Sequence, residues 1–199
     1  MMKTNSGWFF EDYTIGQVME HAVPRTVGQG ERALYHALYP ARHALYSSDL
    51  FAQSCGLPSS PLDDLIAFHV VFGKTVPDIS LNAVANLGYA EARWSRPVYP
   101  GDTLRSLSTV IGLKQNSSGK TGVVWVRSEG FNQRGETVMS FVRWVMVRKN
   151  NLAMPGPQTV VSELRSVVPA AELIVPNDLN FESYRYDLSG SLYIYGDYK

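Results

Sequence analysis

The sequence has little charge and no excess of either sign. It contains 18 Lys and Arg residues and 18 Asp and Glu residues among 199, so its formal net charge is zero. Without a positive field there is no basis for non-specific binding to nucleic acid, and we expect no such partner. Charged residues make up 18% of the chain, below the usual quarter, which favours a surface partly covered by another protein chain.

Cysteine and long apolar runs are also scarce. The single cysteine, Cys55, cannot form an internal disulfide, and no Cys and His residues have metal-ligand spacing, so we expect neither a metal nor a cofactor. A small buried side chain is favoured over a nucleophile for Cys55, because it has no paired base in its sequence context. No uncharged apolar run approaches the roughly 18 residues that cross a bilayer, and Glu11 and Asp12 stand where a signal peptide would be apolar. We therefore predict a cytoplasmic protein without membrane contact.

The first part of the chain contains helical patterns. Pro24 restricts residues 18–26 to an edge strand, and short helices are predicted at residues 31–39 and 47–55. The strongest helical pattern follows the sequence Ser60-Pro61-Leu62-Asp63. Here we predict Ser60 as the cap, Pro61 as the first helical residue and Pro77 as the end. Both faces of this helix are apolar, so it should be enclosed by other structure.

After Pro77 the pattern changes from helical to alternating. Two polar turns ending in glycine, at residues 115–119 and 132–135, separate the last three alternating segments and predict an antiparallel meander. The predicted strands cover residues 80–96, 103–114, 121–131 and 137–148. Helices followed by strands indicate an α+β protein. The expected architecture is a hotdog, in which a curved antiparallel sheet wraps a central buried helix.

Composition changes again near residue 150. Four prolines punctuate a stretch with little periodicity, which predicts an ordered or semi-ordered linker over residues 151–190 after a hotdog domain at residues 1–150. Residues 193–198 (YIYGDY) are similar to residues 8–13 (WFFEDY). We therefore interpret residues 191–199 as the start of a truncated second hotdog repeat.

Several longer motifs resemble those of one enzyme family. Residues 72–91 read FGKTVPDISLNAVANLGYAE, and supporting matches occur at residues 61–65 (PLDDL), 96–104 (RPVYPGDTL) and 119–124 (GKTGVV). The chain resembles the mesaconyl-CoA hydratases, also called 2-methylfumaryl-CoA hydratases, a branch of the MaoC-like dehydratases. The PGDTL portion is generic to MaoC-like hotdogs, whereas the long run is far more specific. The resemblance extends from residue 8 to residue 198.

The resemblance implies a double-hotdog lyase that reversibly adds water across the double bond of a C5 dicarboxylyl-CoA thioester. This sequence would supply the first hotdog and the linker, with about half of the family's usual length missing. The implied partners are an acyl-CoA thioester and either a second hotdog half or a second copy of the chain. Homodimerisation is expected because a lone hotdog leaves a sheet edge to cover.

Hydration of an enoyl thioester needs a base for water, an acid for carbon and donors for the enolate oxygen. MaoC-like hydratases supply the first two from an Asp and a His five positions later, just before a helix with a Phe-Ala pair. Alignment on residues 51–52 places these positions at Ala41 and Tyr46. Neither side chain does that chemistry at neutral pH. We therefore predict no catalytic residue in this chain and assign the dyad to the missing half.

Asp64 and His69 share the spacing of the family's dyad, but on a helix their side chains would diverge by about 140°. A core histidine is the favoured interpretation of His69. Asp63 and Asp64 are interpreted as first-turn residues that suit the helix dipole. Two carboxylates would also repel a developing enolate, which argues against an oxyanion hole at this helix start.

The anionic parts of such a substrate call for arginine. The candidate substrate-binding residues are Arg42 and Tyr46, at the former dyad, and Arg93 and Arg96, at a strand end. A solvated charge is the competing interpretation for each arginine.

Other charged and polar residues are given structural or surface roles, or no evident role. Arg143 and Arg148 lie on a regular strand and are interpreted as charges on the sheet surface. His43 is either a surface residue or a pocket contact, and His21 and His36 have no evident partners.

Two other functions compete with the hydratase. One is a non-catalytic hotdog module that binds acyl-CoA or only dimerises. The other is a hotdog thioesterase, which ranks last because no carboxylate is placed to activate water against the thioester.

Overall fold

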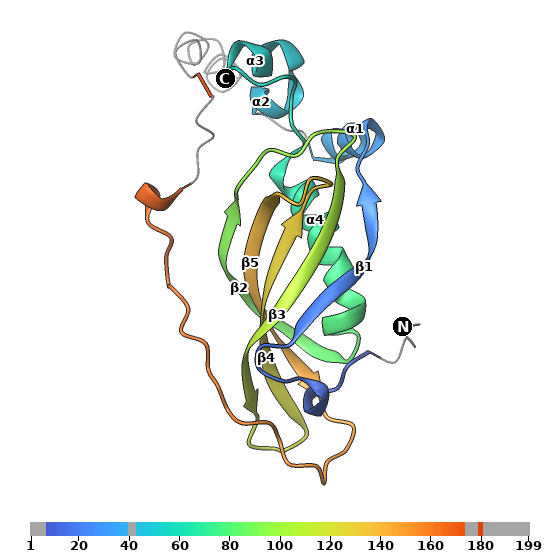
Figure 1. Cartoon of the computed structure of the whole chain (residues 1–199), viewed down its shortest axis with the longest axis vertical. Helices are drawn as coiled ribbons and strands as arrows, with labels where there is room; N and C mark the ends of the chain where they lie inside the picture. Colours follow the sequence, from blue (N-terminus) through green and yellow to red (C-terminus); the bar gives the residue numbers. More distant parts are fainter. Residues whose placement is uncertain (1–6, 40–42, 174–178, 181–199) are drawn as a thin grey trace, which may run out of the picture.

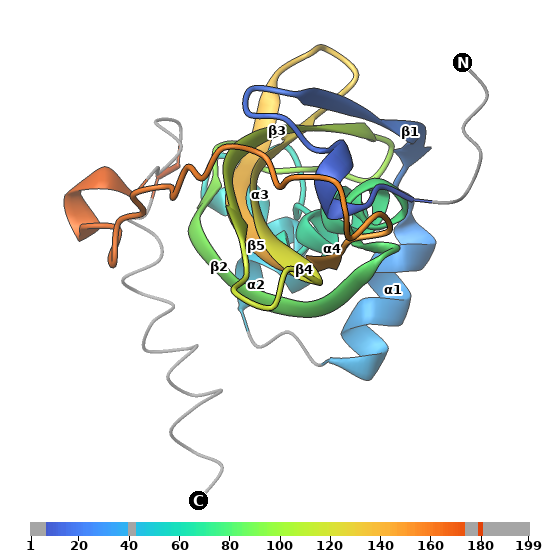
Figure 2. The same cartoon turned by 90° about the horizontal axis from the view of Figure 1, so that it is seen from below.

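The computed structural model describes residues 7–39, 43–173 and 179–180, which form one sheet with a long helix on one face (Figure 1). The sheet is antiparallel with strand order β1-β3-β4-β5-β2. Its strands are β1 (Val18–Thr26), β2 (Ala83–Trp94), β3 (Thr103–Gln115), β4 (Thr121–Phe131) and β5 (Thr137–Arg148). Seen from below, the strands curve around the helix α4 (Asp64–Thr75) (Figure 2). The predicted strands are confirmed, and β1 is an edge strand as Pro24 indicates.

The meander β3-β4-β5 is closed by the two predicted polar turns. Gly119 and Gly135 have φ values of +69° and +77°, a left-handed conformation that glycine adopts without a steric penalty. Their amides donate to Asn116 and Asn132 carbonyls at 2.9 and 3.0 Å. These turns fix the register in which Trp125 of β4 lies opposite Trp144 of β5.

The core has two apolar clusters on the concave side of the sheet. One surrounds α4 and includes Ile66, Val71 and Phe141. The other lies beside the short 3-10 turn Phe10–Asp12 and includes Phe10 and Val124. Cys55 is fully buried, as predicted for a small apolar side chain.

The start of α4 differs from the prediction. Asp63, not Ser60, caps the helix, and its Oδ1 accepts the amide of Leu65 at 2.9 Å. Ser60 and Leu62 precede the helix, and their amides have partners outside it: Ser60 N–H donates to the Asp49 carboxylate and Leu62 N–H to the Val98 carbonyl. The capping sequence therefore lies before the helix rather than on it.

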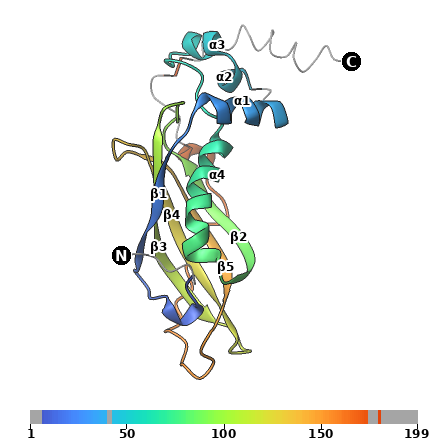
Figure 3. The same cartoon turned by 90° about the vertical axis from the view of Figure 1, so that its right-hand side faces the viewer.

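The end of α4 and its outer face also differ. The α-helix ends at Thr75, but a wider π-helical turn, Val76–Ser80, carries the chain past Pro77. Leu65, at 47% exposure, and His69 are exposed, so the described residues do not enclose the helix on every side. The interpretation of His69 as a core histidine is therefore wrong, because its side chain is exposed on α4, the helix that lies along one face of the sheet (Figure 3).

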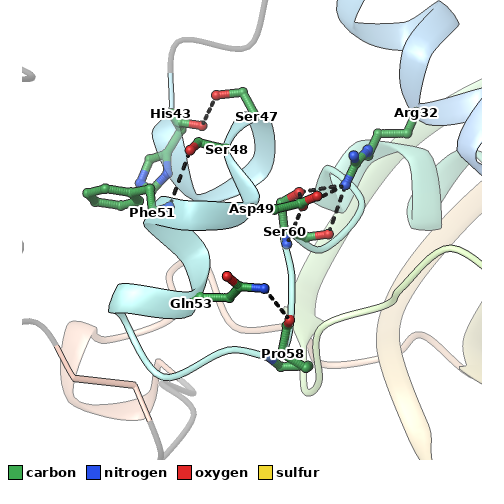
Figure 4. A network of polar contacts seen from close by, with 9 residues as sticks. All are labelled: Arg32, His43, Ser47, Ser48, Asp49, Phe51, Gln53, Pro58 and Ser60. Atoms are coloured by element: carbon green, nitrogen blue, oxygen red, sulfur yellow. Dashed lines mark hydrogen bonds and ion pairs between the residues drawn. The ribbon is translucent and has the colours of Figure 1, made fainter.

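Three short helices lie beyond one end of the sheet: α1 (Gln29–Leu38), α2 (Ala44–Ser47) and α3 (Asp49–Ser54). The sequence predicts one helix over residues 47–55, but Ser48 is extended and separates α2 from α3. The Ser48 hydroxyl accepts the amide of Phe51 at 3.2 Å, which caps α3. Figure 4 shows that Arg32 of α1 reaches both Asp49 of α3 and Ser60, with Nη1 2.5 Å from the Ser60 hydroxyl.

Beyond β5 the chain runs back along the sheet in an extended conformation and forms one short 3-10 turn, Ala170–Glu172 (Figure 1). The division of the chain at residues 150 and 190 remains a prediction. Residues 191–199, interpreted as the start of a second repeat, lie outside the described residues. Across the described ranges, no helix has the length and apolar character needed to cross a membrane.

Candidate functional site

The site begins where the family's dyad was expected, between α2 and the first turn of α4. The hydroxyl of Tyr46, on α2, lies close enough to the Asp64 carboxylate for each group to shift the pKa of the other. Burial raises the pKa of the Tyr46 hydroxyl, and the nearby Asp64 charge raises it further. Burial also raises the pKa of Asp64, and the interaction with Tyr46 opposes that shift. Trp94 of β2 donates its Nε1–H to the Asp64 backbone carbonyl at 2.9 Å, which ties the strand end to the helix start.

The side chains in this arrangement are poorly suited to taking a proton from water. The Tyr46 phenol stays protonated at neutral pH and cannot take a proton from water. The Asp64 carboxylate lies close to that phenol in a partly buried place, and Asp63 is used as the helix cap. Together the two carboxylates place negative charge at the helix start, where an enolate oxygen would need donors. The absence of a catalytic residue in this chain remains a prediction that these contacts support.

The candidate arginines do not converge on Tyr46. Arg42 lies outside the described residues, as does Ala41. Arg93 Nη2 is 2.8 Å from a Glu172 carboxylate oxygen, and Arg96 Nη1 is 3.8 Å from that of Glu136. Arg93 and Arg96 thus each have a carboxylate partner within this chain.

Arg143 is a buried residue that the sequence interpretation missed. Its side chain is on the inner face of β5 and is 1% exposed, so its interpretation as a surface charge is wrong. Nη2 donates to the Thr75 hydroxyl at 3.1 Å, and the guanidinium lies 4.7 Å from the centre of the Phe72 ring. Burial lowers the pKa of Arg143. The alternation of β5 contained the signal, because Arg143 is in phase with the buried Phe141.

His21 is the second missed residue, and it lies in a buried polar network rather than without partners. Its Nδ1 is hydrogen bonded to the Asp78 carboxylate, and its Nε2 is 2.8 Å from the Ser108 hydroxyl. Ser108 in turn contacts the Ser128 hydroxyl at 2.7 Å. The residue types are those of a hydrolase triad, but Ser108 is fully buried and a substrate cannot reach it. No sequence spacing links these residues, so only the fold identifies the network.

A pocket of about 230 Å³ lies between α1 and α4. Its rim carries the ion pair between Arg25 and Glu31, with Nη2 and Oε1 3.0 Å apart. Its walls are Leu34, Tyr35, Leu38, Ile66, His69 and Val70. Within the described ranges, no group of three or more His, Cys, Asp or Glu side chains could hold a metal ion.

Comparisons with known proteins agree with the sequence motifs. A sequence model of the mesaconyl-CoA hydratase family matches residues 2–191. The chain is 66% identical over 197 residues to the mesaconyl-CoA hydratase of Cereibacter sphaeroides, covering 99% of this chain and 57% of that protein. The structure matches that of a MaoC domain protein dehydratase from Chloroflexus aurantiacus with a TM-score of 0.85 and 58% identity, over 88% of this chain and 50% of that one.

The same comparisons confirm the fold. A Mycobacterium tuberculosis protein with a double hotdog fold matches with a TM-score of 0.75 and 26% identity, over 90% of this chain and 56% of that one. The chain spans about half the length of the curated relatives it matches. Its α+β hotdog, with α4 against a curved antiparallel sheet, is therefore established by both topology and likeness. Because the family match covers nearly all of the sequence, the chain belongs to the mesaconyl-CoA hydratase family.

Proposed function

We propose that this chain is the non-catalytic half of a cytoplasmic acyl-CoA hydratase of the mesaconyl-CoA type. In the reversible reaction, water adds its oxygen to the β-carbon of the unsaturated thioester, and the α-carbon gains a proton. The likeness to a mesaconyl-CoA hydratase along 99% of the chain carries this proposal. The Tyr46–Asp64 pair at the former dyad supports assigning the base and the acid to a second half.

The free edge of β2 is our candidate for the surface that meets this second half. β2 is an edge strand, and its side chains Val84, Leu87 and Tyr89 are exposed. A long apolar edge strand is a ready template for pairing with another chain. β1, the other edge, is interrupted by Pro24 and a register shift. In this proposal, residues 1–150 form the hotdog, residues 151–190 the linker and residues 191–199 the start of the second repeat.

The substrate would lie against the Tyr46 side of this half. Arg96, whose side chain is largely exposed, is the candidate ligand for a carboxylate or CoA phosphate. Arg93 would have to exchange its Glu172 partner to serve the same purpose. Arg42 remains a candidate by sequence alone.

Reconstitution tests the enzyme assignment. The coding DNA beyond Lys199 should encode a second half with an Asp- or Asn-initiated motif and a His five positions later. That half, expressed separately and mixed with this chain, should remove the unsaturation of mesaconyl-CoA, whereas this chain alone should not. A folded, complete pair without any rate would contradict the enzyme assignment.

The alternative is a non-catalytic module that binds acyl-CoA or dimerises. The Tyr46–Asp64 contact favours it for this chain in isolation, since that contact leaves no free base. A stop codon followed by no second half, together with acyl-CoA binding and no turnover, would support this module over the hydratase.

A further inference from the structure

The segment from residue 156 to residue 172, here called the strap, is fastened to the sheet at two places. The first fastening uses neutral groups. Val160 and Leu113 exchange two backbone hydrogen bonds, of 2.7 and 2.8 Å, and the Ser162 hydroxyl donates to the Ile111 carbonyl at 2.8 Å. A register shift in β3 places Gly112 here, where a Cβ atom would lie 2.7 Å from the Ser162 hydroxyl. The sheet is therefore shaped to accept the strap at this point.

The second fastening is ionic and lies over β2 and β4. Glu91 sits at a register shift in β2 with a φ of +53°, an uncommon conformation for a residue with a side chain. Its carboxylate accepts Arg127 Nη2 at 2.8 Å and the backbone N–H of Arg165 at 3.2 Å. The Glu172 carboxylate accepts hydrogen bonds from Nη1 and Nη2 of Arg165 and from Arg93 Nη2, the last at 2.8 Å.

The two fastenings differ in their response to solvent. The Arg165 and Glu172 side chains are 51% and 36% exposed, so salt screens their attraction. The side-chain hydrogen bonds from Arg165 and Arg93 hold the pKa of Glu172 at about 2, so this fastening stays charged at neutral pH. The backbone bonds between Val160 and Leu113 carry no net charge and are indifferent to moderate salt.

We propose that Glu172, Arg165, Arg93 and Glu91 form an ionic latch that opens independently of the neutral anchor at Val160 and Ser162. Closed, the latch holds residue 172 against the β2 end of the sheet. Open, it frees residues 163–172, ten residues that can extend up to about 35 Å from the anchor. If the second half pairs with β2, which rests on the proposed function, the closed latch raises the effective concentration of that second half at the β2 edge.

Amide hydrogen exchange on the full chain tests the latch directly. Exchange of residues 165–172 is compared with that of Val160 and Leu113 at about 50 mM and about 500 mM NaCl. Glu172→Gln removes one latch carboxylate, and Glu163→Gln makes the same charge change on an exposed strap residue outside the latch. We expect salt, or Glu172→Gln at low salt, to raise exchange at 165–172 about three- to tenfold and leave Val160 unchanged.

Either of two results would overturn the latch. One is equal exchange of residues 165–172 in the Glu172→Gln and Glu163→Gln proteins. The other is Val160 and residues 165–172 opening together, which would make the strap a single unit. Neither result bears on the hydratase assignment, because this chain is measured alone. Conversely, selective opening of residues 165–172 supports the latch even where a reconstituted pair shows no turnover.

Discussion

Replacement of His21 by alanine should be the most damaging single change to this fold. The His21 ring is buried and has a partner at each nitrogen, Asp78 from the π-helical turn and Ser108 from β3. His21→Ala deprives a buried carboxylate and a buried hydroxyl of this partner at once. Leaving a buried polar group without its hydrogen-bond partner costs about 1–3 kcal/mol, so the loss of both bonds costs about 2–6 kcal/mol. A domain of this kind has about 5–15 kcal/mol of stability, so a large fraction would be lost.

Urea unfolding at neutral pH measures this loss. His69→Ala is the matched control, because His69 is exposed on α4 and its removal should change the free energy of unfolding by less than about 0.5 kcal/mol. In a double-mutant cycle with Asp78→Asn, the two changes should couple by about 1–3 kcal/mol. A His21→Ala loss below about 1 kcal/mol, or a coupling near zero, would refute the view that the network joins β1 to the turn after α4.

Three further changes test other parts of the structure. Arg143→Met should leave the free energy of unfolding unchanged or raise it by up to about 2 kcal/mol in thermal or urea unfolding, because it removes a buried cation. Gly122→Ala should lower the free energy of unfolding by about 1–3 kcal/mol, because a Cβ atom would lie 2.3 Å from the Phe10 ring. Adding Phe10→Leu to the Gly122→Ala protein should recover part of this loss. Burial raises the pKa of Asp64 above its ordinary 3.8. The contribution of Asp64 to folding stability is therefore fully present below pH 3.8 and is lost as the pH rises through the pKa of the folded state. Asp64→Asn should therefore stabilise the protein at pH 7 relative to its effect near pH 3, as unfolding measured at both pH values would show.

The sheet could be predicted well from the sequence because its pattern is local. β4 and β5 have the predicted limits, since alternation and glycine-ended turns act within one hairpin. The start of α4 could not be predicted in the same way. Ser60 and Asp63 both have the chemistry of a cap, and the choice depends on Asp49 and Val98, which reach Ser60 and Leu62 only in the folded chain.

The exposure of His69 shows a different limit. Both faces of its helix carry apolar residues, which predicts that other structure encloses the helix. Within the described residues, however, the stripe that contains Leu65 and His69 meets solvent. Apolar residues in a sequence mark surface that is buried when the protein is complete. That includes surface buried against a partner that the isolated chain does not supply.

At the candidate site, the missing dyad could be recognised from a local motif, whereas the contact between Tyr46 and Asp64 depends on the fold. Tyr46 and Asp64 are 18 positions apart and neither belongs to a catalytic motif, yet the fold brings their side chains close enough to shift each other's pKa. The motif comparison alone states what is missing there. The contact adds a reason why restoring a single residue would not suffice: a histidine at position 46 would face a carboxylate at the helix start, where the enolate oxygen needs a donor. If this half lacks the dyad, as we propose, then giving it hydratase activity would require both the dyad and an uncharged helix start, which is a change at several positions together.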